Sequence, residues 1–461
     1  MSTRPNFLPE RETREWQDLD NKHYLHPFTT HKEIRENSAR IIERAEDIYV
    51  YTHDGEKLLD GMAGLWCCNL GYSRPEIVDA VHQQLQYLPF YNNFFQCAHT
   101  TVIEASHRII NDVAPDHITD VFFTGSGSEA NDTNIRIVRR YWDVQGQSQR
   151  KYIISRDNAY HGSTIAATSL GGIADMKKQV DGMGNVEHIM PPYHFELSEH
   201  GESEEAFGER AAQALEDKIL ALGPENVAAF IGEPIMGAGG VKIPPANYWK
   251  LIEKICRKYN ILLILDEVIT GFGRLGHWFA CDYYGIKPDL ITFAKAVTNG
   301  FQQLGGVLVS DRVSKVLNSD SQEFTHGYTY SGHPAACAAA LATIGVFERD
   351  NVLDYVRNEI GPYFTERLSE LKGHPLVGEV RTIGMLGAIE IVKDKASKTR
   401  FPGEVNAGVI IRDCFINEGV IMRAVGQTMV AAPPLVITKS QVDELIEKAR
   451  AGLDKAASKL I

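Results

Sequence analysis

The sequence predicts an α/β protein with a large, mainly parallel sheet between helices, followed by a smaller α+β part. From about residue 119, short apolar runs alternate with longer amphipathic stretches, which is the rhythm of βαβ units. The runs are apolar at every position, as in a parallel sheet that is covered on both faces. A chain of 461 residues is too long for one simple core. We therefore expect two domains, of which the first is the larger.

The expected elements follow one another in the order that this fold requires. Short apolar runs predict strands at 121–124, 151–155, 186–190, 227–233, 261–267 and 289–295. Amphipathic or alanine-rich stretches predict helices at 134–142, from about 162, and at 204–222, 247–259 and 334–347. In the second unit we expect strand material at 377–392 and 420–425, a helix near 404–418 and a closing helix at 440–460.

These elements divide the chain into three parts. Residues 71–340 form the large domain and residues 341–461 the small C-terminal domain. Residues 1–70, which include a D-G turn at 54–55, are expected to pack with the small domain.

Composition excludes several classes of protein. Hydrophobic residues make up 44% and charged residues 23%, as in an ordinary globular protein. The net charge of −13 argues against nucleic acid as a partner. The longest aliphatic run, 261–265, is far shorter than the roughly 18 to 20 residues of a membrane span, and we expect no membrane association. The seven cysteines include no C-x-x-C pair, so no disulfide framework and no metal site are expected. The N-terminus lacks the apolar core of an export signal, which predicts a cytoplasmic protein.

Two charged residues end neighbouring strands of the predicted sheet. Asp266 closes the run 261–265, and Lys295 closes the next apolar run along the chain. The carboxyl ends of parallel strands meet at one edge, where such sheets place their chemistry. Burial would lower the pKa of Lys295, and a free amine opposite a carboxylate is the pair that pyridoxal phosphate requires. A plain Asp-Lys ion pair, or a lysine whose head reaches water, remains an alternative at this stage.

Two further segments fit the same cofactor. In FFTGSGSEAND, a strand leads through a Gly/Ser turn into a helix, so that Ser126, Gly127 and Ser128 form a plausible phosphate cradle. Tyr160 follows the run 151–155 and offers a flat face for stacking on a heteroaromatic ring. A capped strand-to-helix turn and a packed tyrosine explain each segment equally well when it is taken alone.

A competing motif, GFGRLG at 271–276, matches G-x-G-x-x-G. It would make the protein a nicotinamide oxidoreductase. Five residues separate it from the preceding strand, and bulky residues up to Pro288 leave no room for the expected helix. We therefore disfavour dinucleotide binding.

The run from 263 to 300, LILDEVITGFGRLGHWFACDYYGIKPDLITFAKAVTNG, resembles the signature of class III pyridoxal-phosphate aminotransferases. The segments GMAGLWCCNLGY, LPFYNNFFQCAHT, HGYTYSGHP and IMRAVGQTMVAAPPLVI are most similar to the amine, putrescine and β-alanine:pyruvate branch, the omega-transaminases. The resemblance covers nearly the whole chain. It implies PLP fold type I with a seven-stranded sheet, and a homodimer or tetramer with shared active sites.

The resemblance also implies a role for individual residues. Lys295 would form the Schiff base, Asp266 would hold the pyridine nitrogen, and Glu233 would lie near the phenolic oxygen. The other implied contacts are Tyr160 and Val268 on the two ring faces, Ser126, Gly127 and Ser128 on the phosphate, Thr329 reaching the partner's phosphate, and Trp66 in the substrate pocket.

Arg423 resembles an arginine that pairs with an acceptor's carboxylate and swings aside for donors without one. A guanidinium fork matches a carboxylate in this way, although an arginine satisfied at a strand edge stays an alternative. Two positions depart from the family pattern. Ala296 stands where the family usually has a glycine, and Met236 stands where a glutamine is common.

The resemblance implies a transferase that moves the amino group of a primary amine, diamine or omega-amino acid to pyruvate by ping-pong chemistry. The alternatives are another class III enzyme, such as a 2-oxoglutarate-dependent aminotransferase, a decarboxylase or an aminomutase.

Overall fold

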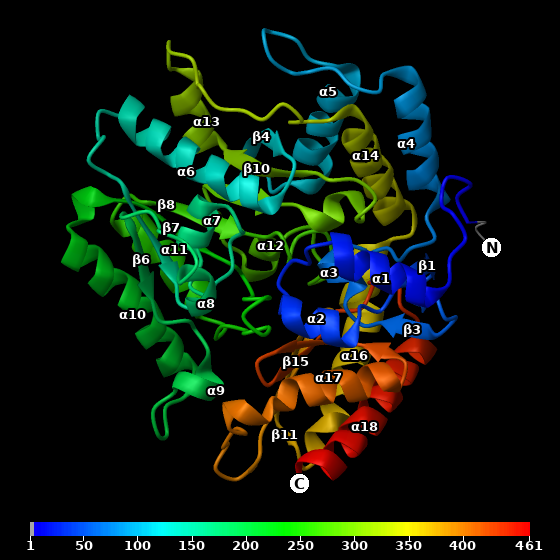
Figure 1. The fold of residues 1–461 in the computed structure, drawn as a ribbon. Coiled ribbons are helices and arrows are strands. Elements are labelled where there is room, and N and C mark those ends of the chain that lie inside the picture. The colour runs from blue at the N-terminus through cyan, green and yellow to red at the C-terminus, as the bar shows by residue number, and fades with distance from the viewer. Residues whose placement is uncertain (1–3) are drawn as a thin grey trace.

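A computed structural model describes residues 4–461 as an α/β protein with one large mixed sheet and two small sheets (Figure 1). The large sheet has seven strands in the order β4-β10-β9-β8-β7-β5-β6. They are β4 (Ile118–Thr124), β5 (Tyr152–Arg156), β6 (Val186–Ile189), β7 (Val227–Gly232), β8 (Leu262–Asp266), β9 (Leu290–Phe293) and β10 (Gly305–Ser310). The predicted fold class is confirmed.

The central strands carry the uniformly apolar pattern because helices cover both faces of the sheet. Every residue of β7, β8, β9 and β10 is buried. The helices of this part are α4 (Pro75–Tyr87), α5 (Thr100–Arg108), α6 (Gly127–Val144), α7 (Ile165–Leu170), α8 (Ala174–Lys177), α9 (His194–Leu197), α10 (Glu204–Leu222), α11 (Tyr248–Lys258), α12 (Ala280–Tyr284), α13 (Asp311–Asn318) and α14 (Pro334–Arg349). Helix α6 packs across the sheet, and α14 packs on α4 and α5 (Figure 1).

Strand β10 is the one member of the large sheet that sequence analysis did not assign. It runs antiparallel to both β4 and β9, between which it is inserted. Its first residues, Gly305 and Gly306, allow a close approach of neighbouring groups. A Cβ at Gly306 would lie 2.6 Å from the Phe293 ring and 2.7 Å from the Phe122 carbonyl oxygen. A short apolar run that begins with two glycines gives no sign of strand direction.

The remaining strands form two four-stranded sheets. One contains β11 (Val377–Ile383), β12 (Leu386–Ile391), β15 (Thr428–Ala431) and β14 (Arg423–Val425), in that order. The other contains β1 (Ile42–Glu46), β2 (Tyr49–Thr52), β3 (Lys57–Asp60) and β13 (Val420–Ile421), with β13 parallel to β3. The helices outside the large sheet are α1 (Thr13–His23), α2 (His31–Asn37), α3 (Ala63–Trp66), α15 (Val352–Tyr355), α16 (Gly361–Ser369), α17 (Ala407–Asn417) and α18 (Lys439–Leu460). The N-terminal segment thus shares a sheet with the C-terminal part, whereas the predicted domain boundaries stay a prediction.

The GFGRLG motif at 271–276 forms a loop that joins distant parts of the chain. Arg274 is fully buried, and its Nη2 donates to Asn69 Oδ1 at 2.6 Å while its Nη1 donates to the Pro433 carbonyl oxygen at 2.5 Å. The helix after the motif, α12, has only five residues. The motif is therefore a buried connector and does not have the geometry of a dinucleotide fingerprint.

No helix within residues 4–461 is long and apolar enough to cross a bilayer.

Candidate active site

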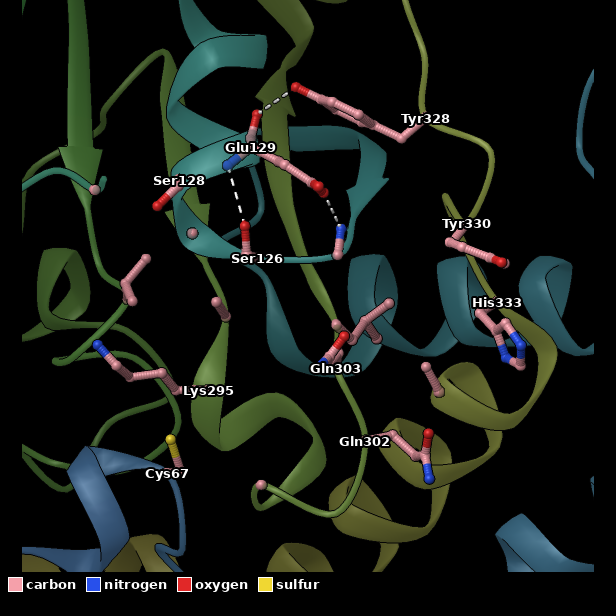
Figure 2. Close-up of a pocket in the computed structure, with 18 of the residues that line it drawn as sticks. Cys67, Ser126, Ser128, Glu129, Lys295, Gln302, Gln303, Tyr328, Tyr330 and His333 are labelled. Carbon is pink, nitrogen blue, oxygen red and sulfur yellow. Dashed lines mark hydrogen bonds between the residues drawn. The ribbon is translucent and has the colours of Figure 1, made fainter. Parts of the chain in front are cut away.

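A cavity of about 1420 Å³ lies at the edge of the large sheet where β8 and β9 end. Its lining includes Lys295, Asp266, Glu233 and the start of α6. Figure 2 shows Lys295 facing the first turn of α6 across the cavity, with Cys67 beside it. The sheet edge thus brings together groups that are far apart in the sequence.

Lys295 lies two residues beyond the end of β9 and opens a short 3-10 turn, Lys295–Thr298. Its backbone is left-handed, with φ 55°, which a residue other than glycine rarely adopts. Burial lowers the pKa of Lys295, whereas the nearby Cys67, Asp266 and Glu233 act in the opposite direction. No hydrogen-bond or ion-pair partner of its ammonium occurs among residues 4–461. The side chain is therefore available for chemistry and inclined toward the neutral amine.

Asp266 ends β8 and is almost fully buried, with 5% of its surface exposed. Its Oδ2 accepts from Asn131 Nδ2 and from His161 Nδ1, both at 2.8 Å. Its Oδ1 accepts only a longer bond of 3.2 Å, from the Val268 amide. Donors therefore fix one oxygen and leave the other with capacity for a further partner.

Asn131 and His161 are site residues to which sequence analysis gave no role. Asn131 is itself held in place, because its Oδ1 accepts from Thr292 Oγ1 at 2.9 Å and from Asn134 Nδ2 at 3.1 Å. Both residues are buried; Asn131 lies in FFTGSGSEAND, and His161 directly follows Tyr160. No local sequence signal links either of them to Asp266, because only the fold brings them into contact with it.

The start of α6 forms an amide-lined edge of the cavity. Ser126 caps the helix, and its Oγ accepts from the Glu129 amide at 3.2 Å (Figure 2). Position 127 requires glycine, because the Cβ of any other residue would lie 2.9 Å from Val268 Cγ2. Ser128 Oγ accepts from the Ser163 amide at 3.0 Å. The helix N-terminus, Val268 and Asp266 thus enclose one end of the cavity, as an anion site next to a ring would require.

Glu233 follows β7 and is held from two sides. Its Oε1 accepts from the Tyr160 amide and its Oε2 from the Gly237 amide, both at 3.0 Å. Burial raises the pKa of Glu233, with His161 acting in the opposite direction. Tyr160 lines the cavity, and its ring contacts Phe28 edge-on at 6.4 Å between centroids.

Trp66 and Arg423 lie beside the cavity, behind its lining. Trp66 is 1% exposed and lies between two cations, with its ring centroid 5.6 Å from Lys295 Nζ and 5.3 Å from Arg423 Cζ. Burial lowers the pKa of Arg423, and no carboxylate pairs with it among the residues that the structure describes. An unpaired guanidinium this close to the lysine is suited to an incoming carboxylate.

The other predicted positions are also placed. Thr329 lines the cavity, next to Tyr328 and Tyr330. Ala296 is buried in the main apolar cluster and is not part of the cavity lining. Met236 is fully buried and pairs with Lys242 in an isolated bridge.

These residues fit pyridoxal phosphate. The cavity offers an unpaired lysine, a buried carboxylate with one oxygen that can accept a further bond, and a helix start that only glycine allows to approach Val268 so closely. Two flat or branched side chains, Tyr160 and Val268, lie in the lining between the phosphate and lysine ends.

The comparison with known proteins agrees with this geometry. The family model for class III aminotransferases matches residues 31–453. A putrescine–pyruvate aminotransferase from Pseudomonas aeruginosa is 51% identical over 98% of this chain and 99% of its own length. A mitochondrial γ-aminobutyrate transaminase from Solanum lycopersicum is 41% identical over 93% of this chain and 84% of its own. The solved omega transaminase from Pseudomonas jessenii, in complex with PMP, is 39% identical with a TM-score of 0.94, and the match covers 96% of this chain and 98% of that one.

Proposed function

Because this chain belongs to the class III aminotransferases, which depend on pyridoxal phosphate, we propose that it is an omega-transaminase that moves the amino group of a primary amine or diamine to pyruvate. The observation that carries the proposal is the arrangement of Lys295 and Asp266 in one cavity with the start of α6. The relative at 51% identity supports a diamine such as putrescine as donor and pyruvate as acceptor.

The residues that would hold the cofactor have distinct tasks. Ser126, Gly127 and Ser128 would bind its phosphate through amides and hydroxyls at the helix start. Asp266 Oδ1 would accept a charged hydrogen bond from the ring nitrogen, worth about 1.5 to 3 kcal/mol. Tyr160 and Val268 would contact the two ring faces.

The bound cofactor supplies an aldehyde that takes up the amino group and a cationic ring that accepts the electron pair. Lys295 would act as general base and acid: its neutral Nζ would take a proton from the substrate carbon that bears the amino nitrogen and release it to the former aldehyde carbon on the other side of that nitrogen. Burial lowers the pKa of Lys295, which increases the fraction of neutral amine near pH 7. Asn131 and His161 keep Asp266 oriented by donating to its Oδ2.

Arg423 and Trp66 would select the substrates. The guanidinium would bind the carboxylate of pyruvate, and a simple amine would find no partner there. Trp66 would form the wall between this guanidinium and Lys295.

We infer that the active form is a homodimer in which Thr329 reaches the partner's phosphate. Large exposed apolar side chains support this arrangement, since they gather along residues 85–95 and at Tyr330. Phe90 contacts Tyr330, which lines the cavity, at 5.5 Å between ring centroids. A cytoplasmic location stays a prediction.

The test is a donor panel with the purified protein and pyridoxal phosphate. Putrescine, β-alanine, γ-aminobutyrate and an arylalkyl amine are each incubated with pyruvate, and alanine is measured. We expect alanine from putrescine, and none from the Lys295→Ala variant. A parallel series replaces pyruvate by 2-oxoglutarate and measures glutamate. Formation of glutamate without any alanine would favour 2-oxoglutarate as the acceptor, and a cofactor-loaded protein that forms neither product would contradict the proposal.

A further inference from the structure

The loop from Glu233 to Lys242 connects the cavity with the small C-terminal sheet. Its base holds Glu233, whose Oε2 accepts from the Gly237 amide at 3.0 Å. Met236 and Lys242 close the loop as an isolated bridge pair. At its tip, Val241 has a left-handed backbone with φ 50°, although a β-branched residue strongly disfavours this region. Such a conformation persists only where surrounding groups hold it.

Arg381 of β11 supplies the groups that hold this loop. Its Nη2 donates to the Gly240 carbonyl oxygen at 2.5 Å, and its Nε donates to the Val241 carbonyl oxygen at 2.7 Å. The guanidinium is buried, with 8% of the side chain exposed. Its planar fork reaches the two carbonyl groups from two different nitrogens in a fixed geometry, which the single nitrogen of an ammonium group does not reproduce.

The same guanidinium is tied to the hairpin that carries Arg423. Arg381 Nη1 pairs with Glu390 Oε2 at 3.1 Å, and that oxygen also accepts from Thr428 Oγ1 at 2.8 Å. Thr428 begins β15, which pairs with β14 and places Arg423 opposite Val430. One buried arginine thus fixes both the loop behind Glu233 and one end of the Arg423 hairpin.

Apolar contacts complete the link to the substrate wall. Val241, Trp66 and Val430 belong to one buried cluster, which also contains Ile235 and Ile269. Trp66 itself has a left-handed backbone, with φ 60°. The two residues with a left-handed backbone, Val241 and Trp66, therefore belong to the same buried cluster, and Trp66 is also the ring that lies close to both Lys295 Nζ and Arg423 Cζ.

We propose that Arg381 is a positioning residue for the site, which sets Glu233 and the wall formed by Trp66 and Arg423 through the strained loop 236–242. The proposal rests on the proposed function, because it assigns Arg381 to the placement of the cofactor and acceptor groups. It predicts effects on cofactor binding and on the KM for pyruvate in addition to any effect on stability.

The test compares two variants with two matched controls. Arg381→Lys keeps the charge and loses the fork. Gly240→Ala leaves the ion pairs intact and strains the loop tip, where φ is 104° and the nearest atom to a new Cβ is 3.5 Å away. Arg367→Lys is the arginine control, because Arg367 of α16 forms ion pairs with Glu370 and with Asp443 of α18 and does not line the cavity. Gly201→Ala is the glycine control, with φ 80° and open space around it.

Cofactor Kd, the KM for pyruvate, kcat and thermal unfolding are measured for all proteins. For Arg381→Lys and Gly240→Ala, we expect the Kd of pyridoxal phosphate and the KM for pyruvate to rise about tenfold, through a lost charge-assisted bond in the first variant and backbone strain in the second. Both controls should stay within about twofold of wild type, even where thermal unfolding shifts equally.

The outcomes separate this inference from the proposed function. A wild-type protein that neither binds the cofactor nor forms alanine would remove the function on which it rests. A working wild type together with variants that lose only thermal stability would overturn the positioning role. If Arg381→Lys does not fold, Gly240→Ala decides alone, since its ion cluster is untouched.

Discussion

Replacing Arg423 by methionine should separate the two halves of the reaction. Arg423 is buried beside Trp66, and no carboxylate pairs with it among residues 4–461. Methionine replaces the aliphatic stem of arginine and removes the guanidinium. If loss of the guanidinium costs the equivalent of one charge-assisted hydrogen bond to pyruvate, the variant loses about 1.5 to 3 kcal/mol, or about 10- to 150-fold in kcat/KM for the pyruvate half-reaction.

The half-reaction with a simple amine should change by no more than about threefold, because such an amine has no carboxylate to accept hydrogen bonds from the guanidinium. Thermal stability should stay the same or rise. Burial lowers the pKa of Arg423, so the folded protein holds a charge that it desolvates without a partner. A buried, unpaired arginine that lowers the stability of the fold is expected where the function requires it, as we propose for Arg423.

The assay follows the cofactor's absorbance in a stopped-flow instrument, first with amine alone and then with pyruvate added to the aminated enzyme. Arg412→Met is the control, since Arg412 lies on α17 and pairs only with its neighbour Asp413. Equal losses in both half-reactions, or an unchanged rate with pyruvate, would refute the reasoning about Arg423.

Three further predictions concern the cofactor end of the cavity. Lys295→Met should abolish turnover while the protein still binds pyridoxal phosphate. Burial lowers the pKa of Lys295 below that of the unfolded chain, so its protonation destabilises the folded apoprotein at neutral pH, and this penalty fades as pH rises toward about 10.4. Urea unfolding of the two apoproteins should therefore show the variant to be more stable at pH 7 and the difference to shrink at pH 10; a constant difference would contradict this. Asp266→Asn should lower kcat by about 100-fold or more and shift the cofactor's visible band, because an amide does not keep the ring nitrogen charged; an unshifted band would argue against that contact. Gly127→Ala should weaken cofactor binding about tenfold, since its Cβ would lie 2.9 Å from Val268 Cγ2, and equilibrium titration measures this; unchanged binding would mean that the helix start is not the phosphate site.

The sequence was sufficient for the part of the site that depends on strand ends. Asp266 ends β8 and Lys295 lies just beyond β9. Parallel neighbouring strands place such residues at one edge of the sheet, so their proximity followed from two uniformly apolar runs that point in the same direction. The start of α6 was predicted for a similar reason, since serine at a helix start has a local signature.

The sequence was insufficient where a role depends on long-range contacts. His161 and Asn131 reach Asp266 from other elements, and nothing local distinguishes them from other buried polar residues. The insertion of β10 between β4 and β9 depends on which neighbours two glycines allow to approach. Arg274 lay within a motif that resembles a dinucleotide fingerprint, and only the fold shows it bonded to Asn69 and Pro433.

The two halves of the site are built on different kinds of support, and this difference bears on which of them can change. Asp266 ends β8 and Lys295 lies just beyond β9, both of which are fully buried strands of the large sheet, so a shift of either residue would disturb a close-packed core. Trp66 and Arg423 belong instead to a kinked turn and to a three-residue strand outside that sheet. Their positions depend on a left-handed backbone and on a buried arginine that spans two parts of the chain. Substitutions in these walls should therefore alter which amine or acid is accepted, while the groups that bind the cofactor stay in place.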